Sequence, residues 1–287
     1  MGGSGGQSVD ELIVLNPPKL PIPTSLRRHA GRWKKLKARL SPLVKAALKE
    51  GAPLFLSTKR IKPRKIRQIF TSEESLRAID RFVDESSRQG FVVECKGGTL
   101  LPQVESPIFA IPKKEPGKWR IILDMRYINK YQRVPKFKHE GLASISVLIK
   151  PGDWTTQGDI SQGFHHIPVQ KKHQKYLGFS HRGKTYQYVV LPMGSSSSPF
   201  IFNKMLRPVL QHLRALGVRM VLYVDDFLIL GQSRQECARH TQLVVSTLED
   251  LGWHLNVEKS NFSPSQRTPF LGFVIDTRAQ PRVYVPY

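Results

Sequence analysis

Two adjacent carboxylates, Asp225 and Asp226, interrupt the apolar stretch LYVDDFLILG at residues 222–231. The residues on both sides are β-branched, aromatic or aliphatic, a composition typical of two buried strands joined by a turn. A buried ionised carboxylate without a partner costs several kcal/mol, and two neighbouring carboxylates also repel each other. The pattern therefore predicts a carboxylate pair that is kept for chemistry rather than for folding.

Divalent cations account for such a pair, because Mg²⁺ prefers carboxylate oxygens and cancels their mutual repulsion. A two-metal site needs a further carboxylate from elsewhere in the fold, and Asp159 in TTQGDISQGFHHIPV is the best candidate. It ends a strand predicted over 155–160, from which it can face the hairpin at 218–230. The alternative, a pair of solvated turn aspartates, leaves the apolar flanks unexplained.

The charge balance points to a polyanionic partner. Lys and Arg number 45 against 22 Asp and Glu, and residues 1–70 alone carry 16 basic and three acidic residues. Nucleic acid is the first candidate, since a merely solvated surface of this charge would weaken the compact state. The only two cysteines, Cys95 and Cys237, have no paired spacing, so the sequence suggests neither a disulfide framework nor a zinc knuckle. With no secretory signal and no apolar run of about 18 residues, we expect a soluble intracellular protein, in cytoplasm or nucleus, without membrane contact.

Two short helices are predicted over 25–51, with Trp33, Leu36 and Leu40 on one face. The opposite face is basic, and we expect it to bind nucleic-acid phosphates through residues that include Arg27, Arg28, Lys34 and Lys35. A solvated face and an organelle-targeting helix are the alternatives.

The remaining pattern mixes helices and antiparallel hairpins irregularly, which predicts an α+β fold. The predicted elements are a helix from the capping box at 71–74 to Gly90, a hairpin over 106–124, a helix over 198–217 kinked or interrupted at Pro208, a hairpin over 218–230, a helix over 237–252 after a capping box at 233–236, and strands over 270–275 and 282–285.

Several blocks, in their order along the chain, resemble the motifs of reverse transcriptases. They are KWRIILDMRYINK (118–130), GDISQGFHHIPV (158–169), LPMGSSSSPFIFNKML (191–206), YVDD (223–226), LNVEKSNFSPSQ (255–266) and FLGFVID (270–276). In detail they are most similar to the reverse transcriptase domains of DIRS-like retrotransposons, and the similarity runs from about Trp33 to the end.

This resemblance implies a right-hand polymerase fold with fingers and a palm built on an antiparallel sheet. We expect a basic N-terminal extension over 1–70, in which residues 1–6 have the composition of a linker, and fingers and palm over 71–287. Little length follows the last motif, so we expect the thumb to be missing or minimal and to come from a further segment or a protein partner.

The resemblance also assigns roles to individual residues. Asp159, Asp225 and Asp226 would be catalytic and, with the Ile160 carbonyl, would hold two Mg²⁺ ions, with Mn²⁺ as the alternative ion. The other implied roles are Lys113 and Arg120 on the triphosphate, Phe164 against the sugar, Met193 near the base, Lys259 as proton donor to pyrophosphate, and Leu271, Gly272 and Phe273 on the primer end. His165 and His166 lack a third ligand at suitable spacing and are interpreted as packing or turn residues.

The implied activity is DNA synthesis from dNTPs on RNA and DNA template-primers. Phe164 favours deoxynucleotides and so disfavours an RNA-templated RNA polymerase. The alternative is a domesticated reverse-transcriptase fold that serves as an RNA-binding or structural part of a ribonucleoprotein. The retained carboxylates favour the enzyme, because a purely structural protein has little use for them.

Overall fold

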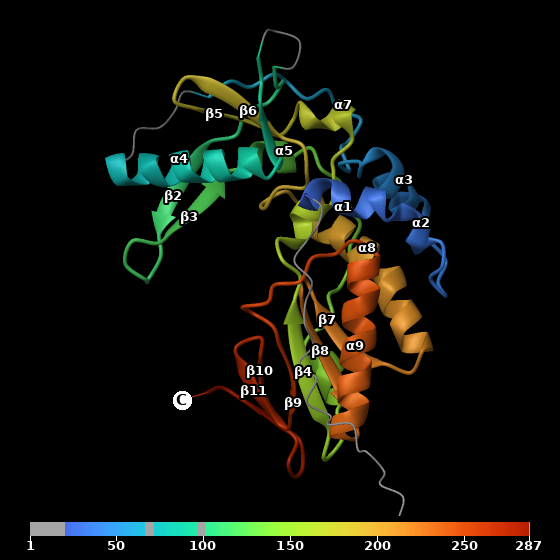
Figure 1. Cartoon of the computed structure of the whole chain (residues 1–287). Helices are drawn as coiled ribbons and strands as arrows, with labels where there is room; N and C mark the ends of the chain where they lie inside the picture. The colour runs from blue at the N-terminus through green and yellow to red at the C-terminus, as the bar shows by residue number, and fades with distance from the viewer. Residues whose placement is uncertain (1–20, 67–71, 97–100, 287) are drawn as a thin grey trace, which may run out of the picture. The chain divides into compact units, whose positions relative to one another are not determined.

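The structure, a computed structural model, describes residues 21–66, 72–96 and 101–286 (Figure 1). Contacts divide these residues into two compact units. The N-terminal unit contains the described residues of 19–137 and 162–208, and the carboxylate unit contains 138–161 and those of 209–287. The predicted division into a basic extension over 1–70 and fingers and palm over 71–287 stays a prediction. The linker-like residues 1–6 lie outside the described part of the chain.

A four-stranded antiparallel sheet in the order β7-β8-β4-β9 forms the centre of the carboxylate unit. Helix α9 lies along this sheet and packs against β8, β4 and β9 (Figure 1). The elements of this unit are α6 (Leu142–Leu148), β4 (Trp154–Asp159), β7 (Arg219–Tyr223), β8 (Asp226–Gly231), α9 (Arg234–Asp250), β9 (Asn261–Ser265), β10 (Arg267–Phe270), β11 (Phe273–Asp276) and β12 (Arg282–Tyr284).

The core of this unit explains why its central strand is so apolar. Strand β8 lies between β7 and β4 and is fully buried from Phe227 to Leu230. Ile145 of α6, Val221 of β7 and Leu228 of β8 pack with two residues of the β10–β11 hairpin, Phe270 and Ile275. Burial of each such side chain contributes roughly 1.5–3 kcal/mol, so the strand that carries Asp226 is anchored along its length.

The N-terminal unit contains a three-stranded sheet, β1-β6-β5, and the β2–β3 hairpin. Helix α4 packs against β1, β2 and β3, and α1 packs against the 3₁₀-helix η1. The elements of this unit are α1 (Ile22–Arg28), α2 (Ala30–Trp33), α3 (Pro42–Glu50), α4 (Glu73–Arg88), β1 (Val92–Glu94), β2 (Ile108–Pro112), β3 (Trp119–Leu123), α5 (Arg126–Asn129), η1 (Gly163–His166), α7 (Lys171–Gln174), β5 (Gly178–His181) and β6 (Lys184–Tyr188). Helix α8 (Ser197–Ala215) begins in this unit and ends in the carboxylate unit.

Most predicted elements are confirmed. Both hairpins are present, and Ser233 caps α9 by accepting the Glu236 N–H at 3.1 Å. At the capping box predicted over 71–74, Ser72 is the residue that caps α4, while Thr71 lies outside the described residues.

Three predictions about elements are wrong in whole or in part. The basic segment forms three helices rather than two. Helix α8 is not interrupted at Pro208, because buried side chains on both sides of the proline, including Leu206 and Val209, keep it packed, while a kink there stays a prediction. The strand predicted over 270–275 is interrupted by a tight turn, because Leu271 and Gly272, with φ of +52° and +79°, separate the end of β10 from β11. Alternating hydrophobicity cannot reveal a turn inside an apolar run. Among the described helices, none is both long and apolar enough to span a bilayer.

Candidate active site

The structure brings the three predicted carboxylates together at one end of the central sheet. Asp159, the last residue of β4, pairs directly with Asp226, the first residue of β8. The Ile160 N–H donates to the Asp225 carbonyl at 2.9 Å, which ties the end of β4 to the turn of the β7–β8 hairpin. Asp159 is 6% exposed, whereas Asp225 and Asp226 are half-buried.

The turn that presents Asp225 has a strained backbone. Tyr223 pairs with Asp226, so Val224 and Asp225 form a two-residue turn, and Val224 has φ of +55°. A positive φ is unfavourable for a β-branched residue and costs on the order of 1–3 kcal/mol. Glu140 supports the strand that leads into this turn, because its carboxylate accepts the Leu222 N–H at 3.1 Å. Such a turn persists only where the surrounding structure fixes it.

Gly158 allows β4 to approach β8 just before the carboxylates. A Cβ atom at this position would lie 2.2 Å from Cζ of Phe227, which is fully buried beside Asp226. No real Cβ atom tolerates such a contact. A side chain here would force the Phe227 ring or the strand to shift, so the glycine favours the register that places Asp159 opposite Asp226.

The carboxylates influence one another electrostatically. Burial raises the pKa of Asp226 to about 6, and repulsion from Asp225 and Asp159 adds to this rise. Burial also raises the pKa of Asp159, whereas Lys259 opposes the rise in both groups. Lys259 is itself exposed. The structure thus places this predicted residue within electrostatic reach of the site.

Two residues of the site were missed in the sequence. The Asn256 side chain hydrogen-bonds the Asp159 carboxylate, and the Asn256 N–H donates to the Asp159 carbonyl at 2.9 Å. The Ser260 hydroxyl accepts the Asp159 N–H at 3.1 Å. Both belong to LNVEKS at 255–260, the block from which only Lys259 was chosen. The polar side chains of Asn256 and Ser260, so close to Lys259 in that block, could have marked them as candidates.

The donor set fits a hard divalent cation. The three carboxylates repel one another and lie near Lys259, so a bound cation would stabilise the site. Within the described ranges, no group of three His, Cys, Asp or Glu side chains is placed to hold a metal ion by itself. Mg²⁺ in phosphoryl-transfer sites is usually held by one or two carboxylates together with substrate phosphates and water, so an all-protein cage is not required.

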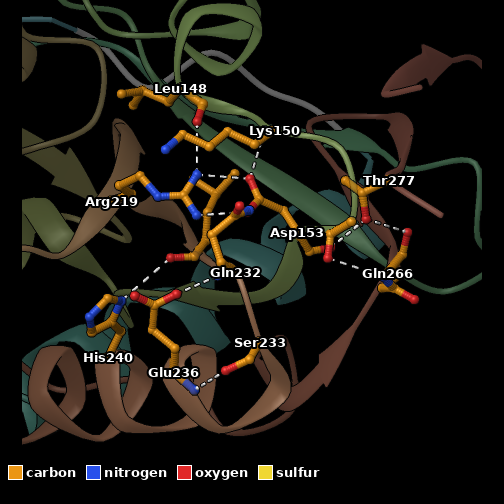
Figure 2. Close-up of polar contacts among 12 residues, drawn as sticks. Leu148, Lys150, Asp153, Arg219, Gln232, Ser233, Glu236, His240, Gln266 and Thr277 are labelled. Atoms are coloured by element: carbon orange, nitrogen blue, oxygen red, sulfur yellow. Dashed lines mark hydrogen bonds and ion pairs between the residues drawn. The ribbon is translucent and has the colours of Figure 1, made fainter. Parts of the chain in front are cut away.

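A buried ion pair fixes the opposite end of the same strands (Figure 2). Asp153, which is fully buried, accepts hydrogen bonds from Arg219 Nη1 and Nη2 at 2.8 and 2.6 Å and from the Lys150 N–H at 2.7 Å. Gln232 donates to the same carboxylate, and Thr277 donates to the Asp153 carbonyl. We call this group the Asp153 clamp. The clamp joins the start of β4 to β7 and to the segment after β8. Asp153 itself lies six residues before Asp159.

The residues predicted to contact the nucleotide all lie in the N-terminal unit. Lys113 and Arg120 are exposed near the tip of the β2–β3 hairpin, where Arg120 pairs with Ile111. Phe164 lies in η1 and is 8% exposed, with its ring 5.3 Å from that of Phe202 in an edge-to-face contact. Met193 is 57% exposed. The nucleotide-contact roles of these residues remain predictions.

Leu271, Gly272 and Phe273 lie in the carboxylate unit at the β10–β11 turn, where Leu271 packs against the core around Ile145 and Leu228. The four basic residues predicted to bind nucleic acid, Arg27, Arg28, Lys34 and Lys35, are all exposed. Trp33, between them in sequence, is completely buried. Hence this segment presents charge but no exposed tryptophan on which a base could stack.

A protein-family model described as "Reverse transcriptase (RNA-dependent DNA polymerase)" matches residues 111–275, more than half of the chain. The Pro-Pol polyprotein of feline foamy virus is 27% identical over 223 residues, which cover 78% of this chain and 18% of that protein. The Gag-Pro-Pol polyprotein of human T-cell leukemia virus 2 is 28% identical over 211 residues, covering 70% and 14%. The chain thus spans less than a fifth of the length of these relatives.

Solved structures share the fold. The foamy viral protease–reverse transcriptase in complex with dsDNA superposes with a TM-score of 0.69 at 23% identity, covering 96% of this chain and 58% of that one. The same kind of protein in complex with an RNA/DNA hybrid gives a TM-score of 0.68 at 23% identity, covering 96% and 37%. The fold is therefore the predicted right-hand polymerase fold. The family model matches more than half of the chain and includes every predicted site residue from Lys113 to Phe273, so the chain belongs to the reverse transcriptase family.

Proposed function

We propose that this chain is a DNA polymerase that copies RNA and DNA templates by adding dNTPs to a primer 3′-hydroxyl. The observation that carries the proposal is the pairing of Asp159 with Asp226 across β4 and β8, beside Asp225 at the hairpin turn. Carboxylates with raised pKa values at the end of a rigid, buried sheet are typical of a site built for chemistry. The scaffold alternative gives no reason for a strained turn and a glycine that together fix these carboxylates.

Asp159, Asp225, Asp226 and the Ile160 carbonyl would hold two Mg²⁺ ions, or Mn²⁺ in their place. Bound there, the ions would activate the primer 3′-hydroxyl and would neutralise negative charge on the reacting phosphate and on the leaving pyrophosphate. The protein orients the ligands. Asn256 and Ser260 fix the side chain and the backbone of Asp159, and the Asp225 carbonyl is held by the Ile160 N–H.

Other residues would act on the nucleotide. Lys113 supplies a flexible point charge and Arg120 a two-pronged donor, which suits them to bind a triphosphate. Phe164 would exclude a 2′-hydroxyl, and Met193 would lie beside the base. Lys259 would donate a proton to pyrophosphate, a role supported by its electrostatic effect on Asp159 and Asp226.

The primer and template would be held elsewhere on the chain. Leu271, Gly272 and Phe273 form a tight turn that would grip the primer end. Between residues 21 and 49 there are nine Lys or Arg and no Asp or Glu. We expect this surface to bind phosphates without sequence preference, because the contacts would be ionic. A further segment or a protein partner would supply a thumb.

Descent from a DIRS-like retrotransposon is a finer proposal. It rests on the detailed similarity of LRALGVRMVLYVDDFLIL and NVEKS…PSQRTPFLGFVIDT to that group. Sequencing the genomic neighbourhood tests it, since these elements encode a tyrosine recombinase. An adjacent integrase gene would argue against this descent.

Primer extension separates the polymerase from the scaffold alternative. The purified chain is given Mg²⁺, a labelled primer on RNA or DNA, and either dNTPs or rNTPs. We expect extension with dNTPs on both templates and little extension with rNTPs. Tight RNA binding without any extension would favour the scaffold.

A further inference from the structure

The loop that carries Met193 is held by two amide side chains that lie more than 60 residues earlier in the sequence. Residues 192–198, which we call the serine loop, precede α8, include its first two residues and contain four consecutive serines. Ser195, Ser197 and Ser198 are buried, whereas Met193 projects outward. Buried polar groups need partners within the protein, so the loop depends on what surrounds it.

Asn129, at the end of α5, holds the first part of the serine loop. Its Nδ2 donates to the Gly194 carbonyl at 2.9 Å, and its Oδ1 accepts the Ser196 N–H at 3.0 Å. One side-chain amide therefore bonds the residues on either side of Ser195. Gly194 directly follows Met193, so its carbonyl is one of the backbone groups that determine where Met193 lies.

Gln132 holds the second part of the loop and also Asn129. Its Oε1 accepts the Ser197 N–H at 2.8 Å and the Ser197 hydroxyl. Its Nε2 donates to Asn129 Oδ1 at 3.1 Å and to Ser195 Oγ at 3.2 Å. Gln132 is itself buried. We call Asn129 and Gln132 the amide latch.

The latch also satisfies one of the N–H groups that a helix leaves open at its start. Gln132, from the residues just after α5, accepts the N–H of Ser197, the first residue of α8, and Asn129 accepts the N–H of Ser196 just before the helix. Gly194 adds a further restriction, because its φ is +89° and a Cβ atom there would lie 3.3 Å from the Leu123 carbonyl oxygen. These contacts from outside the loop add to its internal hydrogen bonds, in which Ser198 donates to the Pro192 and Ser195 carbonyls.

We propose that Asn129 and Gln132 are positioning residues that set the place of Met193 and thereby determine how well the chain discriminates between incoming nucleotides. This inference rests on the proposed function, in which Met193 lies beside the base. Each amide both donates and accepts a hydrogen bond, so a carboxylate of the same shape loses the donor. Without these donors, the Gly194 carbonyl and the Ser195 hydroxyl lose partners, and the loop gains freedom next to the nucleotide.

Two near-isosteric variants of the full chain, Asn129→Asp and Gln132→Glu, test this inference, with Ser195→Ala as a milder third. Single-nucleotide extension would give kcat and KM for correct and incorrect dNTPs. We expect the KM for the correct dNTP to rise about tenfold with kcat changed less than twofold, because each net hydrogen bond accounts for about a tenfold change. Misinsertion should become more frequent, and amide deuterium uptake over 192–198 should rise. Binding of the primer-template should not change.

The matched control is Gln211→Glu, an exposed glutamine in the later part of α8. It should leave every one of these measurements at the wild-type value. Variants with raised deuterium uptake but wild-type KM and misinsertion would overturn the inference, as would unchanged uptake in all three. A wild-type chain that extends no primer would contradict the proposed function and the inference together, so the two failures are distinguishable.

Discussion

Gly158 and Phe227 face each other across β4 and β8, one residue away from Asp159 and Asp226. Replacing Gly158 by Ala would force the rigid, buried ring of Phe227 to move, because the new Cβ would lie 2.2 Å from it. We expect Gly158→Ala to lower the free energy of unfolding by about 1–3 kcal/mol and to reduce primer extension at least tenfold. Urea unfolding and extension assays measure the two effects.

Gly31→Ala is the control for that substitution. Gly31 lies in α2, has no heavy atom within 4 Å of an added Cβ, and has no positive φ. Alanine there should be neutral or stabilise the helix by roughly 0.5–1 kcal/mol. Equal effects of the two substitutions would show that the close approach at Gly158 does not matter.

The burial of His165 should make the free energy of unfolding depend on pH. Its ring lies 4.3 Å from that of Phe91, and burial lowers its pKa to about 4. Between about pH 6.5 and 4 the unfolded chain binds a proton that the folded chain does not, so stability contributed by neutral His165 falls as pH falls. The advantage of wild type over His165→Phe should shrink by about 3 kcal/mol from pH 7 to pH 4, measured by urea unfolding. Parallel pH profiles would contradict this assignment.

At the scale of elements, the Asp153 clamp holds the strands that carry the catalytic carboxylates. Asp153→Asn leaves Arg219 facing a neutral partner at a site where the wild-type carboxylate is fully buried. Breaking a buried ion pair costs about 3–5 kcal/mol, and this substitution should approach that range. The matched control is Asp276→Asn, which removes a carboxylate from the exposed Arg278 in the same unit and should cost at most about 1 kcal/mol. Thermal unfolding compares the two, and similar losses would argue against the clamp.

The sequence predicts strongly patterned elements well. The hairpin around Asp225 and Asp226 follows from two apolar arms, and α9 follows from its cap at Ser233. The turn at Leu271 and Gly272 was not predicted, because it lies inside an apolar run and places a leucine at positive φ. Asn129, Gln132 and Asn256 were missed because their partners are distant in sequence or bond through the backbone. Such contacts exist only once the chain has folded.

At the scale of the whole molecule, the formal charge of +23 indicates binding to a polyanion. If Arg27 and Arg28 each neutralise a phosphate, the double substitution to Ala should reduce the slope of log K against log salt by about 1–2, because each contact contributes roughly 0.7–0.9. The control is the double substitution of Arg81 and Arg239, which are exposed on α4 and α9. Fluorescence anisotropy from about 50 to 300 mM salt measures the slope. A slope that changes equally in both double variants would assign the effect to net charge alone.

The most direct test of the account is primer extension by Asp225→Asn, compared with wild type and with Asp84→Asn, which changes an exposed carboxylate on α4. All three proteins are assayed on RNA and DNA templates with Mg²⁺, and their binding to the same primer-template is measured. We expect Asp225→Asn to bind normally and to extend at least about a thousandfold more slowly, since it loses a ligand needed only for chemistry. Asp84→Asn should match wild type. Extension by Asp225→Asn at the wild-type rate would contradict the assignment of these carboxylates as the polymerase site.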